Sequence, residues 1–114
     1  MQIKVAEQVE AKPVEADGAA DVTMRMLIGP GDGAPTFNMR MFELAPGGHT
    51  PLHRHAWEHE VYILTGRGVC RTAGGDEPVE SGHCLLVSGG DLHQFLNTGE
   101  APMRMLCLVP RDSG

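Results

Sequence analysis

Basic residues, long apolar runs and paired cysteine motifs are all scarce in this sequence. Fifteen aspartates and glutamates outnumber nine lysines and arginines, and the formal net charge of −6 argues against nucleic acid or an anionic membrane as a partner. No apolar run approaches the roughly 20 residues of a transmembrane helix. The first residues alternate and carry charge, so we expect no signal peptide.

Cysteine occurs without the spacings of a disulfide framework. Cys70, Cys84 and Cys107 are an odd number, and no two of them form a CxxC pair. Each lies in an apolar stretch, where a thiol behaves as a small hydrophobic side chain. We therefore expect three buried free thiols and a cytoplasmic protein.

Helical periodicity, internal repeats and linker-like segments are also missing. A chain of 114 residues is long enough for one domain with a single core. Its fifteen glycines and eight prolines are scattered, as in proteins with many short strands and tight turns. We predict an all-β domain, a closed barrel or a sandwich. The predicted strands cover residues 2–9, 21–28, 37–45, 61–64, 69–72, 78–80, 84–87, 93–97 and 103–109.

Four of the six histidines, beginning with His49, lie within eleven residues. Neutral imidazole is the commonest protein ligand of divalent transition metals, so this stretch predicts a metal site. Side chains two residues apart on a strand share a face, which would turn His53 and His55 to the same side. His59 has the same parity, and Glu60 competes with it as a carboxylate ligand. If His59 is the ligand, residues 61, 63 and 65 of the following strand share its face and point inward.

The spacing of this stretch resembles the first motif of the cupin family. In that motif, a glycine, five residues, His-x-His, three or four residues, a glutamate, six residues and a second glycine follow one another. Here the same positions are Gly47, His53, His55, His59 and Gly66, with a histidine in place of the glutamate. Counting to residue 60 instead leaves only five residues before the second glycine, which favours His59.

A second stretch resembles the second cupin motif. That motif runs glycine, five residues, Pro-x-Gly, two residues, histidine, three residues, asparagine. The corresponding residues are Gly82, Ser88, Gly90, His93 and Asn97, and only the proline is replaced. Two motifs at the right separation are far more specific than an isolated His-x-His.

The resemblance implies a small antiparallel barrel of the double-stranded β-helix or jelly-roll type, formed by residues 1–114 as a single domain. It also implies one divalent transition metal per chain (Mn, Fe, Ni or Zn, with Mn or Fe favoured), held by His53, His55, His59 and His93. The stretch from Trp57 to Tyr62 is similar to small cupins with an all-histidine site that can hold manganese.

Four neutral imidazoles would leave the charge of a divalent ion uncancelled and two positions open for oxygen ligands. The resemblance therefore implies a metalloenzyme acting on a small oxygen-rich molecule (a carboxylate, diketone or enediol), such as a dioxygenase, a decarboxylase or an isomerase. The alternative is a cupin that binds or senses a small molecule without turnover. No catalytic residue or general base is fixed by the motifs.

Residues outside the motifs carry weaker expectations. His49 and His83 match no ligand position and are expected to face solvent, and Asn97 to satisfy backbone groups at a turn. Arg25, Arg40 and Arg104 lie on predicted strands, and one that points inward would bind a carboxylate. Small cupins commonly form homodimers, and the N-terminal strand and loop over residues 1–20 would then lie in the interface.

Overall fold

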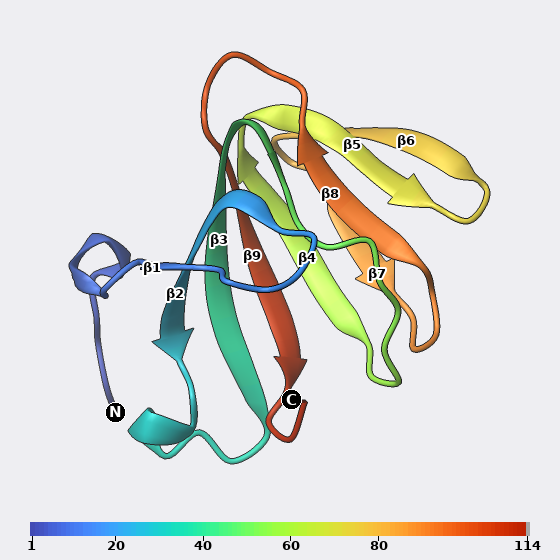
Figure 1. Ribbon diagram of the computed structural model, residues 1–114. Coiled ribbons are helices and arrows are strands. Elements are labelled where there is room, and N and C mark those ends of the chain that lie inside the picture. The colour runs from blue at the N-terminus through green and yellow to red at the C-terminus, as the bar shows by residue number, and fades with distance from the viewer. Residues whose placement is uncertain (114) are drawn as a thin grey trace.

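The computed structural model describes residues 1–113 and is built almost entirely of antiparallel β-strands (Figure 1). Two single turns of 3-10 helix, η1 (Ala6–Gln8) and η2 (Pro30–Asp32), precede the third strand. The strands are β1 (Lys12–Pro13), β2 (Ala20–Ile28), β3 (Phe37–His49), β4 (His59–Thr65), β5 (Arg67–Thr72), β6 (Gly75–Glu80), β7 (Cys84–Val87), β8 (His93–Asn97) and β9 (Met103–Pro110).

All nine strands belong to one sheet, in the order β6-β5-β8-β3-β9-β4-β7, with β2 paired to β3 and β1 to β2. The longest strand, β3, connects the two ends of this path. Its first part pairs with β9 from Phe37 to Leu44, and its last residue, His49, pairs with Leu96 of β8. The sheet curls around this strand (Figure 1), which confirms the all-β, antiparallel, barrel-like fold.

The change of partner along β3 occurs where the sequence is rich in glycine. Gly47 has a φ of 80°, a conformation that L-amino acids with a Cβ rarely adopt. A Cβ on Gly48 would lie 2.7 Å from the carbonyl oxygen of Asp21. The chain can therefore bend here while staying in the sheet, which is why β3 runs to His49 and not to residue 45 as predicted.

Strand β4 shows which face of the sheet is internal. Val61 and Ile63 are buried, whereas Glu60 and Tyr62 are exposed. This is the register expected for residues 61 and 63 when His59, and not Glu60, faces the interior. The expectation for residue 65 is wrong, because the register of β4 against β9 shifts between Ile63 and Thr65, and Thr65 is exposed. Val61 and Ile63 pack in the core with residues of β3, β8 and β9, including the fully buried Leu44 and Met103. Burying each such side chain stabilises the fold by about 1.5–3 kcal/mol.

The predicted strand over residues 2–9 is wrong. This segment contains η1, and the guanidinium of Arg25 on β2 donates hydrogen bonds to the carbonyls of Ala6, Glu7 and Val9. Carbonyl groups bound in this way do not serve a strand ladder. Arg104 on β9 donates a further hydrogen bond to the Glu7 carboxylate at 2.6 Å, so two arginines hold the N-terminal segment against the outside of the sheet.

The surface confirms part of the remaining expectations. Cys70 and Cys107 are buried free thiols, but Cys84 is exposed, because it begins the short edge strand β7.

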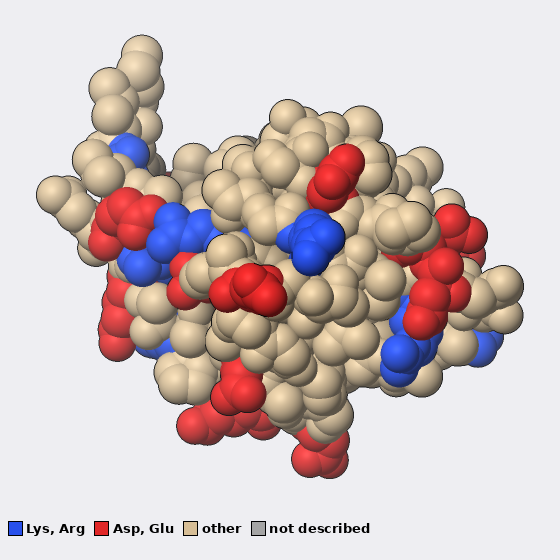
Figure 2. Space-filling view, turned by 90° about the horizontal axis from the view of Figure 1, so that it is seen from above, with Lys and Arg blue, Asp and Glu red and all other residues tan. Residues whose placement is uncertain are grey.

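Acidic and basic side chains are interspersed on the face shown in Figure 2, without a continuous basic area. Both helical elements within residues 1–113 are single turns, and neither has the length or the apolar character needed to cross a membrane.

Candidate metal centre

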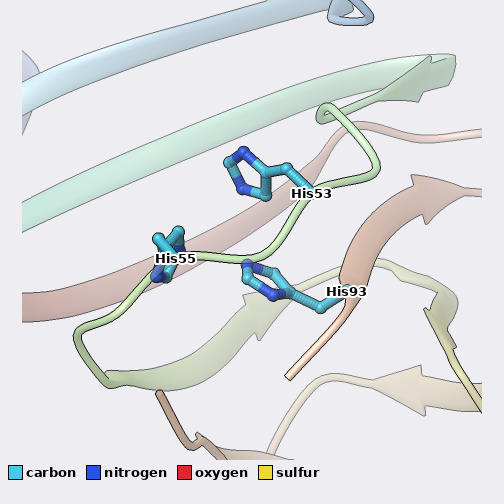
Figure 3. A group of neighbouring side chains, drawn as sticks. All are labelled: His53, His55 and His93. Carbon is cyan, nitrogen blue, oxygen red and sulfur yellow. The ribbon is translucent and has the colours of Figure 1, made fainter. Parts of the chain in front are cut away.

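Three histidines from two separate segments converge on one point. His53 and His55 come from the loop between β3 and β4, and His93 begins β8; their rings face one another in Figure 3. One ring nitrogen of each lies within 4.8 Å of the corresponding nitrogens of the other two. The expectation that His53 and His55 lie on a strand is wrong, because residues 50–58 form a loop with one isolated bridge to β8.

That bridge fixes the backbone of the site. The amide of His53 donates to the carbonyl of His93 at 3.1 Å, and the amide of His93 donates to the carbonyl of His53 at 2.9 Å. A reciprocal pair of backbone hydrogen bonds leaves little freedom between the two Cα atoms. The loop is thus joined to the sheet at the first histidine of the His-x-His motif.

The turn before His93 holds the other part of the loop. The amide of Gly90 donates to the carbonyl of His55 at 2.7 Å, and a Cβ on Gly89 would lie 2.3 Å from the carbonyl oxygen of Ala56. Ser88 occupies the position of the motif's proline, and its amide donates to the Asp91 carboxylate at 3.1 Å. This hydrogen bond restrains the turn that the missing proline ring would otherwise stiffen.

Two of the imidazoles have their tautomers fixed by backbone carbonyls. Nδ1 of His55 lies 3.0 Å from the carbonyl oxygen of Trp57, and Nδ1 of His93 lies 2.8 Å from that of Asp91. A carbonyl only accepts, so each Nδ1 carries the hydrogen and each Nε2 presents a lone pair. Nε2 of His55 is buried and has no hydrogen-bond partner. An orphaned lone pair beside two other imidazoles fits a divalent metal ion.

The surroundings of three of these imidazoles favour their neutral form. Burial, together with the neighbouring imidazoles, lowers the pKa values of His53 and His93. Burial also lowers the pKa of His59 to about 3, with smaller contributions from His55 and the guanidinium of Arg40. Because only the neutral form offers a lone pair, these three side chains are in the protonation state that a metal requires near pH 7.

His59, the fourth predicted ligand, lies beside the group of three. Its ring stacks on His55 with centroids 4.2 Å apart, and His55 stacks in turn on Trp57 at 4.6 Å. Nδ1 of His59 lies 3.2 Å from Sγ of Cys107, a contact that the sequence did not indicate. The ring centroids of His59 and His93 are 5.4 Å apart. His59 is not among the three histidines whose ring nitrogens lie within 4.8 Å of one another.

A pocket of about 170 Å³ opens on this side of the barrel. His53, His59 and His93 form one side of its lining, and apolar side chains including Phe42, Phe95 and Met105 form much of the rest. Arg40, Thr50 and Cys107 complete the polar residues of the lining, which contains no aspartate or glutamate. Such a cavity has room for a molecule of a few heavy atoms beside the histidines.

Arg40 is the inward-pointing arginine that the sequence left undetermined. Its Nη2 donates to Sγ of Cys107 at 3.2 Å, its guanidinium lies 5.0 Å from the centre of the Phe42 ring, and its Nε is buried without a partner. Arg40 lies two residues before Phe42 and so shares its face of β3. Because both faces of this strand carry apolar residues, the sequence did not show which face is internal. Arg25 and Arg104 point outward, to the N-terminal segment.

The remaining expectations have mixed outcomes. Asn97 is buried and bridges three backbone groups: its Nδ2 donates to the carbonyls of Leu44 and Ala101, and its Oδ1 accepts from the amide of Gly99. His83 is exposed, as expected. His49 is half-buried beside Gln94, because the chain bends inward at the end of β3.

Comparison with known proteins gives relatives with a similar fold. The chain is 35% identical over 68 residues to the oxalate-binding protein of Thermotoga maritima, covering 59% of this chain and 56% of that protein. It is 35% identical over 74 residues to 1-methylthio-D-xylulose 5-phosphate methylsulfurylase of Rhodospirillum rubrum, covering 65% of this chain and 47% of that protein. The alignments thus span about half the length of these relatives.

Among solved structures, the polyketide cyclase RemF of Streptomyces resistomycificus superposes with a TM-score of 0.93 at 34% identity, covering 98% of this chain and 80% of that one. The family described as Cupin domain (Cupin_2) matches residues 40–109, which include both histidine motifs. The chain belongs to the Cupin_2 family of cupin domains.

Proposed function

We propose that this cupin binds one divalent transition metal and acts as an enzyme on a small oxygen-rich molecule. The observation that carries the proposal is the buried, unpartnered Nε2 of His55, directed by its Nδ1 hydrogen bond toward the neighbouring imidazoles of His53 and His93. A purely structural role would leave such a nitrogen with a hydrogen-bond partner.

In this proposal His53, His55, His59 and His93 are the metal ligands. The hydrogen bonds from Nδ1 to the Trp57 and Asp91 carbonyls orient two of them and raise their basicity. Manganese or iron is the favoured ion, with nickel and zinc as alternatives. When bound, a divalent ion of this kind polarises two oxygens of a carboxylate, diketone or enediol.

The pocket limits what the chain itself contributes to the reaction. Phe42, Phe95 and Met105 give the space beside the histidines an apolar wall. Because the lining contains no aspartate or glutamate, no carboxylate of these residues is placed there as a general base. This favours reactions in which the charge developing on substrate oxygen is stabilised electrostatically, such as decarboxylation or dioxygenation.

The names of the relatives support two versions of the function. RemF is named a polyketide cyclase. Its similarity to this chain, over 98% of this chain and 80% of RemF, supports an enzymatic function. The Thermotoga maritima relative is named an oxalate-binding protein, which supports the alternative of a cupin that binds a small acid without turnover.

The deciding experiment starts with protein purified without added metal. Elemental analysis identifies the bound ion, and oxygen consumption and carbon dioxide release are then followed with a panel of dicarboxylates and diketones. We expect about one ion per chain and turnover of at least one class of compound. One bound ion without turnover would support the binding alternative, and a failure to bind any divalent ion would refute both versions.

Three further properties belong to the proposal. Residues 1–114 form one cupin domain. Two copies form a homodimer, which the exposed apolar side chains of Met1, Ile3 and Val5 in the N-terminal segment support. The protein is cytoplasmic, which is supported by the free thiols of all three cysteines.

A further inference from the structure

Arg40 has more hydrogen-bonding capacity than the protein uses. A guanidinium offers five N–H donors. In this structure one hydrogen bond is made, from Nη2 to Sγ of Cys107, while Nε is buried and has no partner. The side chain is half-buried and stands beside the ring of Phe42, facing the same pocket as His53 and His93.

The charge of Arg40 is also uncompensated within residues 1–113. None of the five ion pairs in this part of the chain includes Arg40, although Arg25 and Arg104 both pair with Glu7. Its one acceptor, the Cys107 thiol, is a weak acceptor and offers no counter-charge at the 3.2 Å contact with Nη2. A partly buried cation without a counter-charge is costly.

A divalent ion held by neutral histidines would add two positive charges to that of Arg40, and the lining of this pocket has no carboxylate of its own. The compensating charge therefore has to come from the occupant of the pocket. Nε and the adjacent Nη of a guanidinium lie on one edge and match the two oxygens of a carboxylate.

We propose that Arg40 is the anion-binding residue of the pocket, and that the molecule bound there carries a carboxylate in addition to the oxygens that face the histidines. The inference rests on the proposed function and names its substrate class: a carboxylic acid with a second oxygen-rich group, such as a diketo acid. The Nε edge of Arg40 binds the carboxylate, while the aromatic wall of Phe42 keeps the guanidinium plane in place.

The test compares two probes that differ only in this group. Acetylpyruvate is a 1,3-diketone with a carboxylate, and acetylacetone is the same diketone with a methyl group in its place. Each is titrated calorimetrically into the manganese-loaded full chain, as wild type, Arg40→Met, Arg40→Lys and the control Arg67→Met. Arg67 is exposed on β5, outside the pocket lining. Elemental analysis and thermal melting verify that all variants are folded and hold equal amounts of metal.

We expect the wild type to bind acetylpyruvate at least about tenfold more tightly than acetylacetone. Arg40→Met should lower the affinity for acetylpyruvate by about 30-fold or more and leave the affinity for acetylacetone within about threefold of wild type. Arg40→Lys should retain part of the preference, because the charge remains while the two-donor edge is lost. Arg67→Met should match the wild type.

Two results separate the inference from the function on which it rests. If every variant holds metal and Arg40→Met binds both probes as the wild type does, the role of Arg40 is refuted and the metal site stands. If the wild type holds no metal, the proposed function fails. The same titration on metal-free protein then decides the assignment of Arg40: binding of acetylpyruvate that depends on Arg40 upholds it, and the absence of such binding overturns it.

Discussion

His53 and His93 hold each other through their backbones, with each amide donating to the other residue's carbonyl. Their imidazole centroids lie 4.9 Å apart on the pocket side of this bridge. The backbone bonds do not involve the side chains, so the imidazoles can be removed without opening the bridge. Mutations of these side chains should therefore report on metal binding with little loss of fold.

Replacing His93 by alanine should lower metal affinity by more than about 100-fold. Mutating a residue that only hydrogen-bonds to a metal ligand typically lowers the affinity about tenfold to 100-fold, and loss of the ligand itself should lower it further. Competition with a chromophoric chelator measures the change. His83→Ala is the matched control, since His83 is exposed and its Nδ1 accepts from the amide of Glu80, away from the three clustered histidines. Equal affinities for both variants would exclude His93 as a ligand.

His59→Ala should release metal, whereas Glu60→Ala should retain it, because Glu60 is exposed on the outer face of β4. Elemental analysis of both purified variants is the measurement. Loss of metal from Glu60→Ala alone would mean that the carboxylate, and not the imidazole, completes the site. Full retention by both would restrict the ligands to His53, His55 and His93.

Asn97→Ala should destabilise the fold by roughly 2–4 kcal/mol, since it leaves the buried carbonyl of Leu44 and the partly buried groups of Ala101 and Gly99 without their partner. Urea denaturation followed by circular dichroism gives the free energy of unfolding. Thr98→Ala, at the exposed neighbouring position, should change it by less than about 0.5 kcal/mol. A similarly small change for Asn97→Ala would contradict the structural role.

The ion pair between Glu7 and Arg104 should make the stability of the fold depend on pH in the acidic range. The hydrogen bond from Arg104 lowers the pKa of Glu7 below its ordinary value of 4.5. A lowered pKa in the folded state stabilises the fold above the ordinary pKa, and this stabilisation disappears as the pH falls below it. The melting temperature of the wild type should therefore fall more steeply on acidification below pH 4.5 than that of Glu7→Gln. Parallel curves would show that the pair contributes nothing.

The proposed homodimer should depend on the exposed apolar side chains of the N-terminal segment. Ile3 is 89% and Val5 is 56% exposed in the single chain. Ile3→Glu combined with Val5→Glu should convert the dimer to a monomer in light scattering, because two charges would then enter an apolar interface. The control, Glu10→Gln, changes an exposed residue nearby and should remain dimeric. A dimer that survives the double substitution would place the interface elsewhere.

The sequence predicted the strands and the position of the site because both follow simple spacing. Alternation located β2, and turn residues at their ends located β7, β8 and β9, nearly to the residue. The two motifs predicted that His93 lies near His53, although it is distant in the sequence. The N-terminal segment failed because its conformation depends on Arg25, which captures carbonyls far away in the sequence. Local alternation contains no information about such a partner.

Arg40 could not be placed for a different reason. Strand β3 has apolar residues on both faces, since Leu44 is buried in the barrel and Met41 is buried although its parity is opposite. With both faces covered, period-two patterning cannot show which one is internal. Only the pairing of β3 with β9 and the lining of the pocket determine that Arg40 lies on the same side as the histidines.

Trp57 is the only tryptophan in the sequence, and its indole stacks on the imidazole of His55 with an angle of 5° between the ring planes. The tryptophan fluorescence of this chain therefore originates 4.6 Å from the ring of one candidate ligand. A quenching ion that enters the site should dim this emission, and one that binds elsewhere on the surface should leave it unchanged. The indole is thus an optical reporter for metal binding at the candidate site.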